Sequence, residues 1–299
     1  MFERVKLLDW VRPRPRFVPQ FKQRLFLHVG CHRTGTTSIQ NYMRSNAVRL
    51  AQRGYFLPNG RGRHSGLMAQ LMSGEMTAEA LAEQLHAEAL AQVGPQAAIL
   101  LSDEDVSQHE DLAPLQALRH FFEVTVLFSM RRQDTWLESW YFQNIKWQWN
   151  PALSHLTWPE FLDRRAEFHW IDYAAHVGKL ERLFGRKNLR LSVFERGQMP
   201  QGPVVDFCNK IGLKDREGFS TPPHVNASLS AEMTAFFRHL PLDQISTVDR
   251  AIFRNALERV DRSLLGHMSK QSERLMPLDR RKSVLAQFEA GNKALARRY

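Results

Sequence analysis

The sequence predicts a three-layer α/β fold, with a parallel sheet between helices, that continues into a mostly helical C-terminal third. Four short apolar runs, at residues 24–29, 97–101, 124–130 and 189–194, alternate with segments in which apolar residues recur at helical spacing. Repeated alternation of strand and helix is typical of a parallel sheet. The chain has 299 residues and is 43% apolar, which is enough for one such domain with a sizeable core.

The first unit is a strand, a loop and a helix. The run at residues 24–29 is followed at once by Gly30, so we expect a buried strand that enters a tight loop. From Thr36 onward, apolar residues at helical spacing predict a helix that continues to Gly54.

The later elements follow the same reasoning. The run at 189–194 lies between two amphipathic segments, and beyond Pro223 only helical patterns remain. We therefore expect a basic leader at residues 1–22 and a single α/β domain at 23–299. The Pro-Arg tract at residues 12–16 fits a flexible leader, with a role in surface docking left open.

Composition limits the partners and the compartment. A formal net charge of +10 favours an anionic partner, which could be a nucleic acid, a membrane surface or a highly charged cofactor. No run approaches the roughly 20 apolar residues of a membrane span, and the N-terminus lacks a signal-peptide core. Cys31 and Cys208 are too few for a secreted disulfide framework. We expect a soluble cytoplasmic protein in which neither cysteine binds a metal.

A glycine-rich loop follows the first strand. Its sequence, Gly-Cys-His-Arg-Thr-Gly-Thr-Thr at residues 30–37, has the glycine spacing of a phosphate loop that opens a helix. Such a loop turns backbone N–H groups toward an anion, and the helix N-terminus adds partial positive charge. A loop for nucleoside triphosphates would carry lysine where this chain has Thr36. The cation of this loop is Arg33.

This string, His-Val-Gly-x-x-Arg-Thr-Gly-Thr-Thr-Ser at residues 28–38, resembles the 5′-phosphosulfate loop of the sulfotransferases that use 3′-phosphoadenosine-5′-phosphosulfate (PAPS). The resemblance implies a P-loop-type fold and transfer of a sulfuryl group from PAPS to a hydroxyl, with PAP as the product. It also implies that Arg33 acts in catalysis and that the donor is bound by Arg33, Thr34, Gly35, Thr36, Thr37 and Ser38. The family usually has lysine at the position of Arg33, and arginine is planar and bulkier.

The same resemblance implies a 3′-phosphate site made by an arginine at a strand end and a serine eight residues later. The run at 124–130 is followed by Arg131 and Arg132, and Ser139 stands eight residues after Arg131. Arg131 and Ser139 are therefore the expected pair. Arg132 could instead pair with Asp134 or Glu138.

Transfer to a hydroxyl needs a base for its proton. The run at 97–101 leads into Ser-Asp-Glu-Asp at residues 102–105, at the sheet edge where ligands of open α/β folds gather. Glu104 is the first candidate, and Ser-x-Glu here resembles a pattern in bacterial members of the family. His64, in a glycine-rich basic loop, is the alternative. A helix N-cap would also explain the acidic residues.

The acceptor is indicated less directly. Lys146, Trp147, Trp149 and Trp158 interleave charge and indole rings, which suits a wall for a sugar, although core packing explains tryptophans as well. With the resemblance to bacterial glycan-modifying relatives, this favours a carbohydrate hydroxyl as the acceptor. We expect no nucleic-acid partner and leave peripheral contact with a membrane open.

Two other functions remain as alternatives. A P-loop kinase or NTPase would use the acidic segment after residue 101 to hold Mg²⁺, but it would need a lysine at position 36. A non-catalytic polyanion-binding protein would use the net positive charge and the Trp-rich segment, yet no nucleic-acid module is recognisable. For the sulfotransferase we expect no metal, because Arg33 and backbone amides can meet the lower charge of a sulfuryl group.

Overall fold

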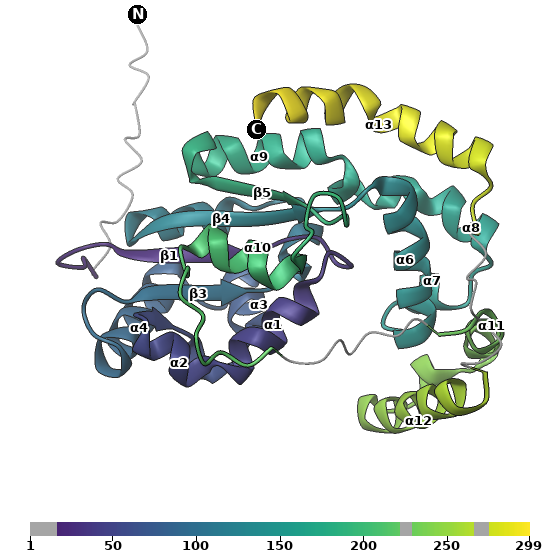
Figure 1. Cartoon of the computed structure of the whole chain (residues 1–299), viewed down its shortest axis with the longest axis horizontal. Helices are drawn as coiled ribbons and strands as arrows, with labels where there is room; N and C mark the ends of the chain where they lie inside the picture. Colours follow the sequence, from purple (N-terminus) through teal and green to yellow (C-terminus); the bar gives the residue numbers. More distant parts are fainter. Residues whose placement is uncertain (1–16, 222–228, 266–274) are drawn as a thin grey trace, which may run out of the picture.

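The computed structural model describes residues 17–221, 229–265 and 275–299, so the tract at residues 12–16 lies outside the described residues. Five strands form one parallel sheet in the order β2-β3-β1-β4-β5 (Figure 1). Their bounds are β1 Gln23–His28, β2 Tyr55–Phe56, β3 Ala98–Ser102, β4 Phe122–Met130 and β5 Leu189–Val193. The predicted α/β fold with a parallel sheet is confirmed.

Strand β1 lies at the centre of the sheet. Leu25 is paired with Ile99 of β3 on one side and with Val124 of β4 on the other. All five residues of β3 are buried, as are the last four of β1. Burial on both faces is the reason that these strands read as continuous apolar runs rather than as alternating ones.

Helices cover both faces of the sheet, which gives the three expected layers. On one face Phe26 and Leu127 pack against α1 (Thr36–Ser45) and α10 (Gly202–Ile211). On the other face Leu27 and Val126 belong to a core with α4 (Ala78–Gln92) and α9 (Tyr173–Phe184). The connecting helices are α2 Ala47–Gln52, α3 Ser65–Ser73, α5 Ala113–Ala117, α6 Gln133–Trp147, α7 Pro151–Ser154 and α8 Trp158–Asp163.

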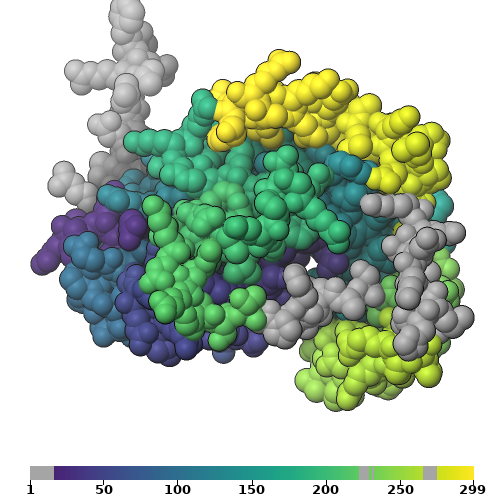
Figure 2. Space-filling model, in the orientation of Figure 1, coloured from purple at the N-terminus to yellow at the C-terminus, as the bar shows by residue number. Residues whose placement is uncertain are grey.

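Beyond residue 223 the described part of the chain contains helices and no further strand, as expected. The helices are α11 Ala231–His239, α12 Thr247–Val260 and α13 Leu278–Arg298. Helix α13 lies along α9 at one margin, whereas α11 and α12 form a lobe near the far end of α6 (Figures 1 and 2). Arg281 of α13 binds Asp134 of α6, with 2.7 Å between Nη2 and Oδ2, and so fixes α13 to the body.

The prediction of one helix from Thr36 to Gly54 is wrong in one detail, because that segment divides into α1 and α2 at Asn46. The Asn46 side chain donates to the carbonyl of Tyr42 and accepts from the N–H of Ser220, each over 2.8 Å. Helical spacing alone does not show this break, because the residue that Asn46 binds lies far away in sequence. Strand β2 was not predicted either, since two residues are too few to show a pattern.

The predicted leader and the two cysteines bear less directly on the position of the site. Phe17, within the predicted leader, stacks on Phe121 at 6.1 Å between ring centroids. Cys31 and Cys208 are both buried and unpaired. Within the residues described, none of the helices combines the length and the apolar character needed to cross a bilayer.

Candidate functional site

The loop between β1 and α1 is curled by two left-handed residues. Arg33 has φ of 65° and Gly35 has φ of 85°. A Cβ at Gly35 would lie 2.8 Å from Pro203 and 2.9 Å from Phe194, so only glycine fits beneath the segment after β5. The N–H groups of Val29 and Cys31 continue the pairing with β4, at 3.1 and 3.3 Å from its carbonyls. The loop is therefore held at the carboxyl end of the central strand.

The N-terminus of α1 presents unused donors. In the described part of the chain, the N–H groups of Gly35, Thr36 and Thr37 donate to no carbonyl or side chain. The first turn of α1 contains no acidic residue that would compete for these donors. Three N–H groups at a positive helix end form a site for an anion.

Arg33 extends from this loop to α6. Its Nε donates to Ser139 Oγ over 2.7 Å, and its Nη1 donates to Gln143 Oε1 over 2.9 Å. Burial, followed by the charge of Arg131, lowers the pKa of Arg33 to about 10, so it remains a cation at neutral pH. No carboxylate among the described residues lies within ion-pair distance of Arg33.

Arg131 lies beside Arg33 at the carboxyl end of β4. Its Nη1 donates to the Arg33 carbonyl over 3.1 Å. The hydroxyl of Tyr173 accepts from the Arg131 N–H over 3.1 Å and donates to the Arg131 carbonyl over 2.6 Å. This places two guanidinium groups at the open end of α1, where they repel each other unless an anion lies between them.

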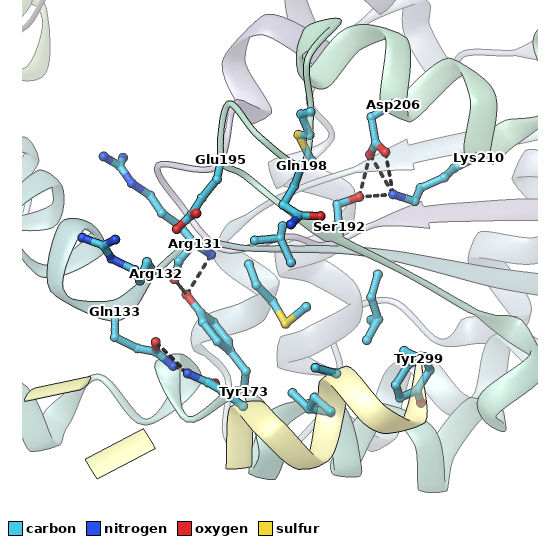
Figure 3. A pocket seen from close by; sticks show the side chains of 17 residues that line it. Arg131, Arg132, Gln133, Tyr173, Ser192, Glu195, Gln198, Asp206, Lys210 and Tyr299 are labelled. Atoms are coloured by element: carbon cyan, nitrogen blue, oxygen red, sulfur yellow. Dashed lines mark hydrogen bonds and ion pairs between the residues drawn. The ribbon is translucent and has the colours of Figure 1, made fainter. Parts of the chain in front are cut away.

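A cavity of about 560 Å³ opens beside Arg131 along the outer edge of β5 (Figure 3). Glu195 and Gln198 from the segment after β5 line it, as does Tyr299 from the end of α13. At its far side Ser192, Asp206 and Lys210 bind one another, with 2.6 Å between Ser192 Oγ and Asp206 Oδ2. The cavity is large enough for a nucleoside and shares Arg131 with the loop site.

The acidic segment after β3 is held by Arg63. Its guanidinium lies 2.9 Å from Asp103, 3.5 Å from Glu104 and 2.5 Å from Asp105. Burial and the neighbouring charge of Asp105 raise the pKa of Asp103 to about 6, although Arg63 opposes the shift. The basic loop before α3 thus turns its arginine toward this chain's own carboxylates. A Cβ at Gly62 would lie 1.8 Å from the Gln40 carbonyl, so its glycine permits contact with α1.

The two predicted bases have their polar atoms engaged. Glu104 is buried, 6% exposed, and its Oε2 accepts from Gln40 over 2.5 Å. His64 Nδ1 accepts from the N–H of Ser102 over 3.1 Å, and its Nε2 lies 3.3 Å from the Pro58 carbonyl. Burial lowers the pKa of His64 to about 4. The structure thus brings Glu104 near the loop through Gln40 and uses His64 to fasten the end of β3.

A second cavity, of about 570 Å³, lies between the loop and α6. Its walls include indole rings and its rim carries amide and charged groups, among them Trp140, Trp149, Trp170, Asn144, Asn150 and Glu167. His32 of the loop also lines it, 2.8 Å from Asp105 and with its ring 4.9 Å from that of Trp140.

The predicted aromatic wall is only partly at this cavity. Trp149 lines it and is 47% exposed. Trp147 is instead covered by Arg254, whose Cζ lies 3.5 Å from the ring centroid, and Lys146 binds Glu258 at 3.1 Å. Trp158 packs against Tyr141 and Phe161.

Several residues of the site were not predicted. Gln143 stands one helical turn after Ser139, so a guanidinium that reaches one can reach both, and that spacing is visible in the sequence. His32 and Tyr173 gave no such signal, because their partners lie 73 and 42 residues away. Arg132 pairs with Asp134, one of its two expected partners, over 2.7 Å. No group of three His, Cys, Asp or Glu side chains within the described ranges is placed to hold a metal ion.

Comparisons with known proteins give the following. No model of a known protein family matches the chain. An uncharacterized protein of Archaeoglobus fulgidus is 27% identical over 172 residues, 57% of this chain, and the chain spans only 44% of that relative's length. The solved sulfotransferase from Alicyclobacillus acidocaldarius is similar at 18% identity and a TM-score of 0.46, over 80% of this chain and 100% of the other. The sulfotransferase domain from the curacin biosynthetic pathway is similar at 11% identity and a TM-score of 0.38, over 67% of this chain and 77% of the other.

Proposed function

We propose that this protein transfers a sulfuryl group from PAPS to a hydroxyl of a carbohydrate. The observation that carries the proposal is the pair of guanidinium groups, Arg33 and Arg131, at the open N-terminus of α1. PAPS carries anionic groups at its 5′ and 3′ ends, and this chain offers a separate cation for each.

The 5′-phosphosulfate would lie in the loop. Arg33 and the N–H groups of Gly35 to Thr37 would bind its anionic oxygens, and Thr36, Thr37 and Ser38 would add hydroxyl groups at the helix start. Thr34 supports the loop from within, since its hydroxyl donates to the Cys31 carbonyl over 2.6 Å. These fixed donors are well placed to stabilise charge on the bridging oxygen as its bond to sulfur breaks.

The 3′-phosphate would lie between Arg131 and Ser139. Ser139 Oγ accepts from Arg33, which leaves its own O–H to donate to a phosphate oxygen. The adenosine would occupy the cavity beside Arg131, where Gln198 and Glu195 offer polar groups to a base or a ribose (Figure 3).

The acceptor would enter the second cavity. Trp149, which is exposed, offers a face for a sugar ring beside the buried indoles of Trp140 and Trp170, and Asn144 and Asn150 offer hydrogen bonds to hydroxyl groups. An aromatic wall with a polar rim favours a carbohydrate over a lipid, whose chain would leave these polar groups unpaired.

A screen with radiolabelled PAPS tests this function. The protein is incubated in EDTA with a panel of glycans, a lipid alcohol and a Tyr-containing peptide, and label transfer is measured. We expect transfer to at least one glycan, because the loop cation and amides replace a metal in this proposal. ATP-dependent labelling that needs Mg²⁺, with no transfer from PAPS, would instead favour the kinase.

A further inference from the structure

We infer that His32 is the general base for the acceptor hydroxyl and that Asp105 positions it, an inference that rests on the proposed function. His32 lines the acceptor cavity, and its Nε2 lies 2.8 Å from Asp105 Oδ1. Its Nδ1 has no hydrogen-bond partner among the described residues. A carboxylate accepts the Nε2 proton, so the lone pair of the neutral ring lies on Nδ1.

The carboxylate that holds His32 is itself fixed. Arg63 Nη2 lies 2.5 Å from the second oxygen of Asp105. Burial alone would raise the pKa of Asp105, but the bond from His32 and the charge of Arg63 outweigh it and lower that pKa. Asp105 is therefore an anion that accepts the Nε2 proton of His32 and fixes its tautomer.

The ring is also held from its other sides. It contacts the indole of Trp140, with centroids 4.9 Å apart, and the His32 carbonyl accepts from Trp136 Nε1 over 2.8 Å. Only 3% of His32 is exposed, so its orientation is set by these contacts.

His32 and Arg33 are consecutive, yet their side chains diverge. Arg33 has the left-handed φ of 65° and reaches α6, whereas His32 reaches Asp105 and the cavity. The same loop thus carries Arg33, the cation proposed for the sulfuryl group, and His32, a base that lines the cavity proposed for the acceptor. General-base catalysis requires this proximity.

Neither of the two bases predicted from the sequence, Glu104 and His64, is among the described residues that line the cavity proposed for the acceptor. Their polar atoms bind Gln40, Arg63 and backbone groups. Glu104 instead helps to hold Arg63, which fixes Asp105.

The proposed step balances as a displacement at sulfur. A lone pair of the acceptor oxygen forms the new O–S bond, and the hydroxyl proton passes to His32 Nδ1. The pair of the bond between sulfur and the bridging oxygen leaves with PAP, which gains one negative charge near Arg33. The proton then returns to solvent, so no oxidant, reductant or metal takes part.

The test measures label transfer from PAPS to p-nitrophenyl β-D-glucopyranoside, with PAPS hydrolysis by water as the readout if that glycoside is not an acceptor. His32→Ala should lose roughly 10²- to 10⁴-fold in kcat, while calorimetry shows PAP affinity close to that of the parent. Added imidazole should restore part of the rate in His32→Ala but not in the parent.

Asp105→Asn should lower kcat less than His32→Ala does, with KM little changed, because it removes the carboxylate that fixes the tautomer of His32. The charges facing His32 are those of Asp105, Arg63, Glu167 and the adjacent Arg33. These four groups belong to different elements, and of the four only Asp105 binds the imidazole ring of His32.

His155→Ala is the matched control, since His155 also pairs with a carboxylate, Asp243 at 3.1 Å, but lies outside the described cavity lining. It should keep the rate of the parent. If the parent transfers label while His32→Ala keeps the rate of the parent, the inference is wrong and the proposed function stands. A matching loss in Glu104→Gln alone would assign the base to Glu104, and loss of PAP affinity in His32→Ala would show a structural role. A parent that neither binds PAP nor consumes PAPS overturns both.

Discussion

Arg33 Nε and Ser139 Oγ lie 2.7 Å apart, although 106 residues separate them in the chain. The contact joins the loop after β1 to the helix after β4, and both carry residues proposed for the donor. Ser139 therefore holds the loop cation as well as facing the proposed 3′-phosphate.

Substitution of Arg33 tests the loop cation. Arg33→Ala should weaken PAP binding by roughly tenfold or more, because it removes charged hydrogen bonds worth about 1.5–3 kcal/mol each. The same change should reduce transfer by roughly 10²- to 10³-fold. Arg33→Lys should keep substantial activity, since its ammonium can still reach Ser139 or Gln143 but not both. Arg53→Ala removes an exposed arginine paired with Asp215 and serves as the control in both assays.

Substitution of Arg131 tests the 3′-phosphate site. Arg131→Ala should narrow the ratio of PAP to AMP affinity by roughly tenfold or more, with AMP binding little changed. Tyr173→Phe should narrow it less, because the phenol only positions the backbone of Arg131. Ser139→Ala should weaken both nucleotides, since Ser139 also holds Arg33. Calorimetric titration of PAP and AMP against the parent and each variant measures these affinities, and an unchanged ratio of PAP to AMP affinity in Arg131→Ala would rule out this assignment.

Acid should destabilise the fold through buried histidines. Burial lowers the pKa of His28, His64 and His176 to about 4 each. These values lie below the ordinary value of 6.5, so the stability they contribute is present above pH 6.5 and is lost as pH falls toward 4. In His64→Gln the fall in the free energy of unfolding between pH 7 and pH 4 should be smaller by about 3 kcal/mol.

Denaturant titration at the two pH values measures that difference. The exposed His120 supplies the control, and His120→Gln should lose as much stability as the parent. An equal loss in His64→Gln and the parent would contradict the account of His64 as a neutral link between Ser102 and Pro58.

The sequence predicted the sheet better than it predicted helix ends. Strands such as β1 and β4 are buried on both faces, so each produces a continuous apolar run that is visible without a structure. The break at Asn46 depends on Ser220, and the two residues of β2 depend on pairing with β3. Long-range hydrogen bonds of this kind leave no periodic pattern.

The same distinction applies to the candidate site. The loop at residues 30–38 is visible in its glycine spacing, and the pair Arg131 and Ser139 was expected from the resemblance to PAPS-dependent sulfotransferases. The structure brings Arg33, Arg131 and Ser139 together. The partners of Glu104 and His64 could not be read locally. Arg63, in the glycine-rich loop that carries His64, binds three carboxylates of the chain itself.

The central claim is that this chain binds PAPS through two cationic sites without a metal. Calorimetric titration of the full chain with PAP in EDTA, followed by ATP with Mg²⁺, tests it most directly. The account predicts one PAP site in EDTA, with an affinity that exceeds that of AMP and falls in both Arg33→Ala and Arg131→Ala. An absence of PAP binding in EDTA, together with tight binding of ATP and Mg²⁺, would contradict it.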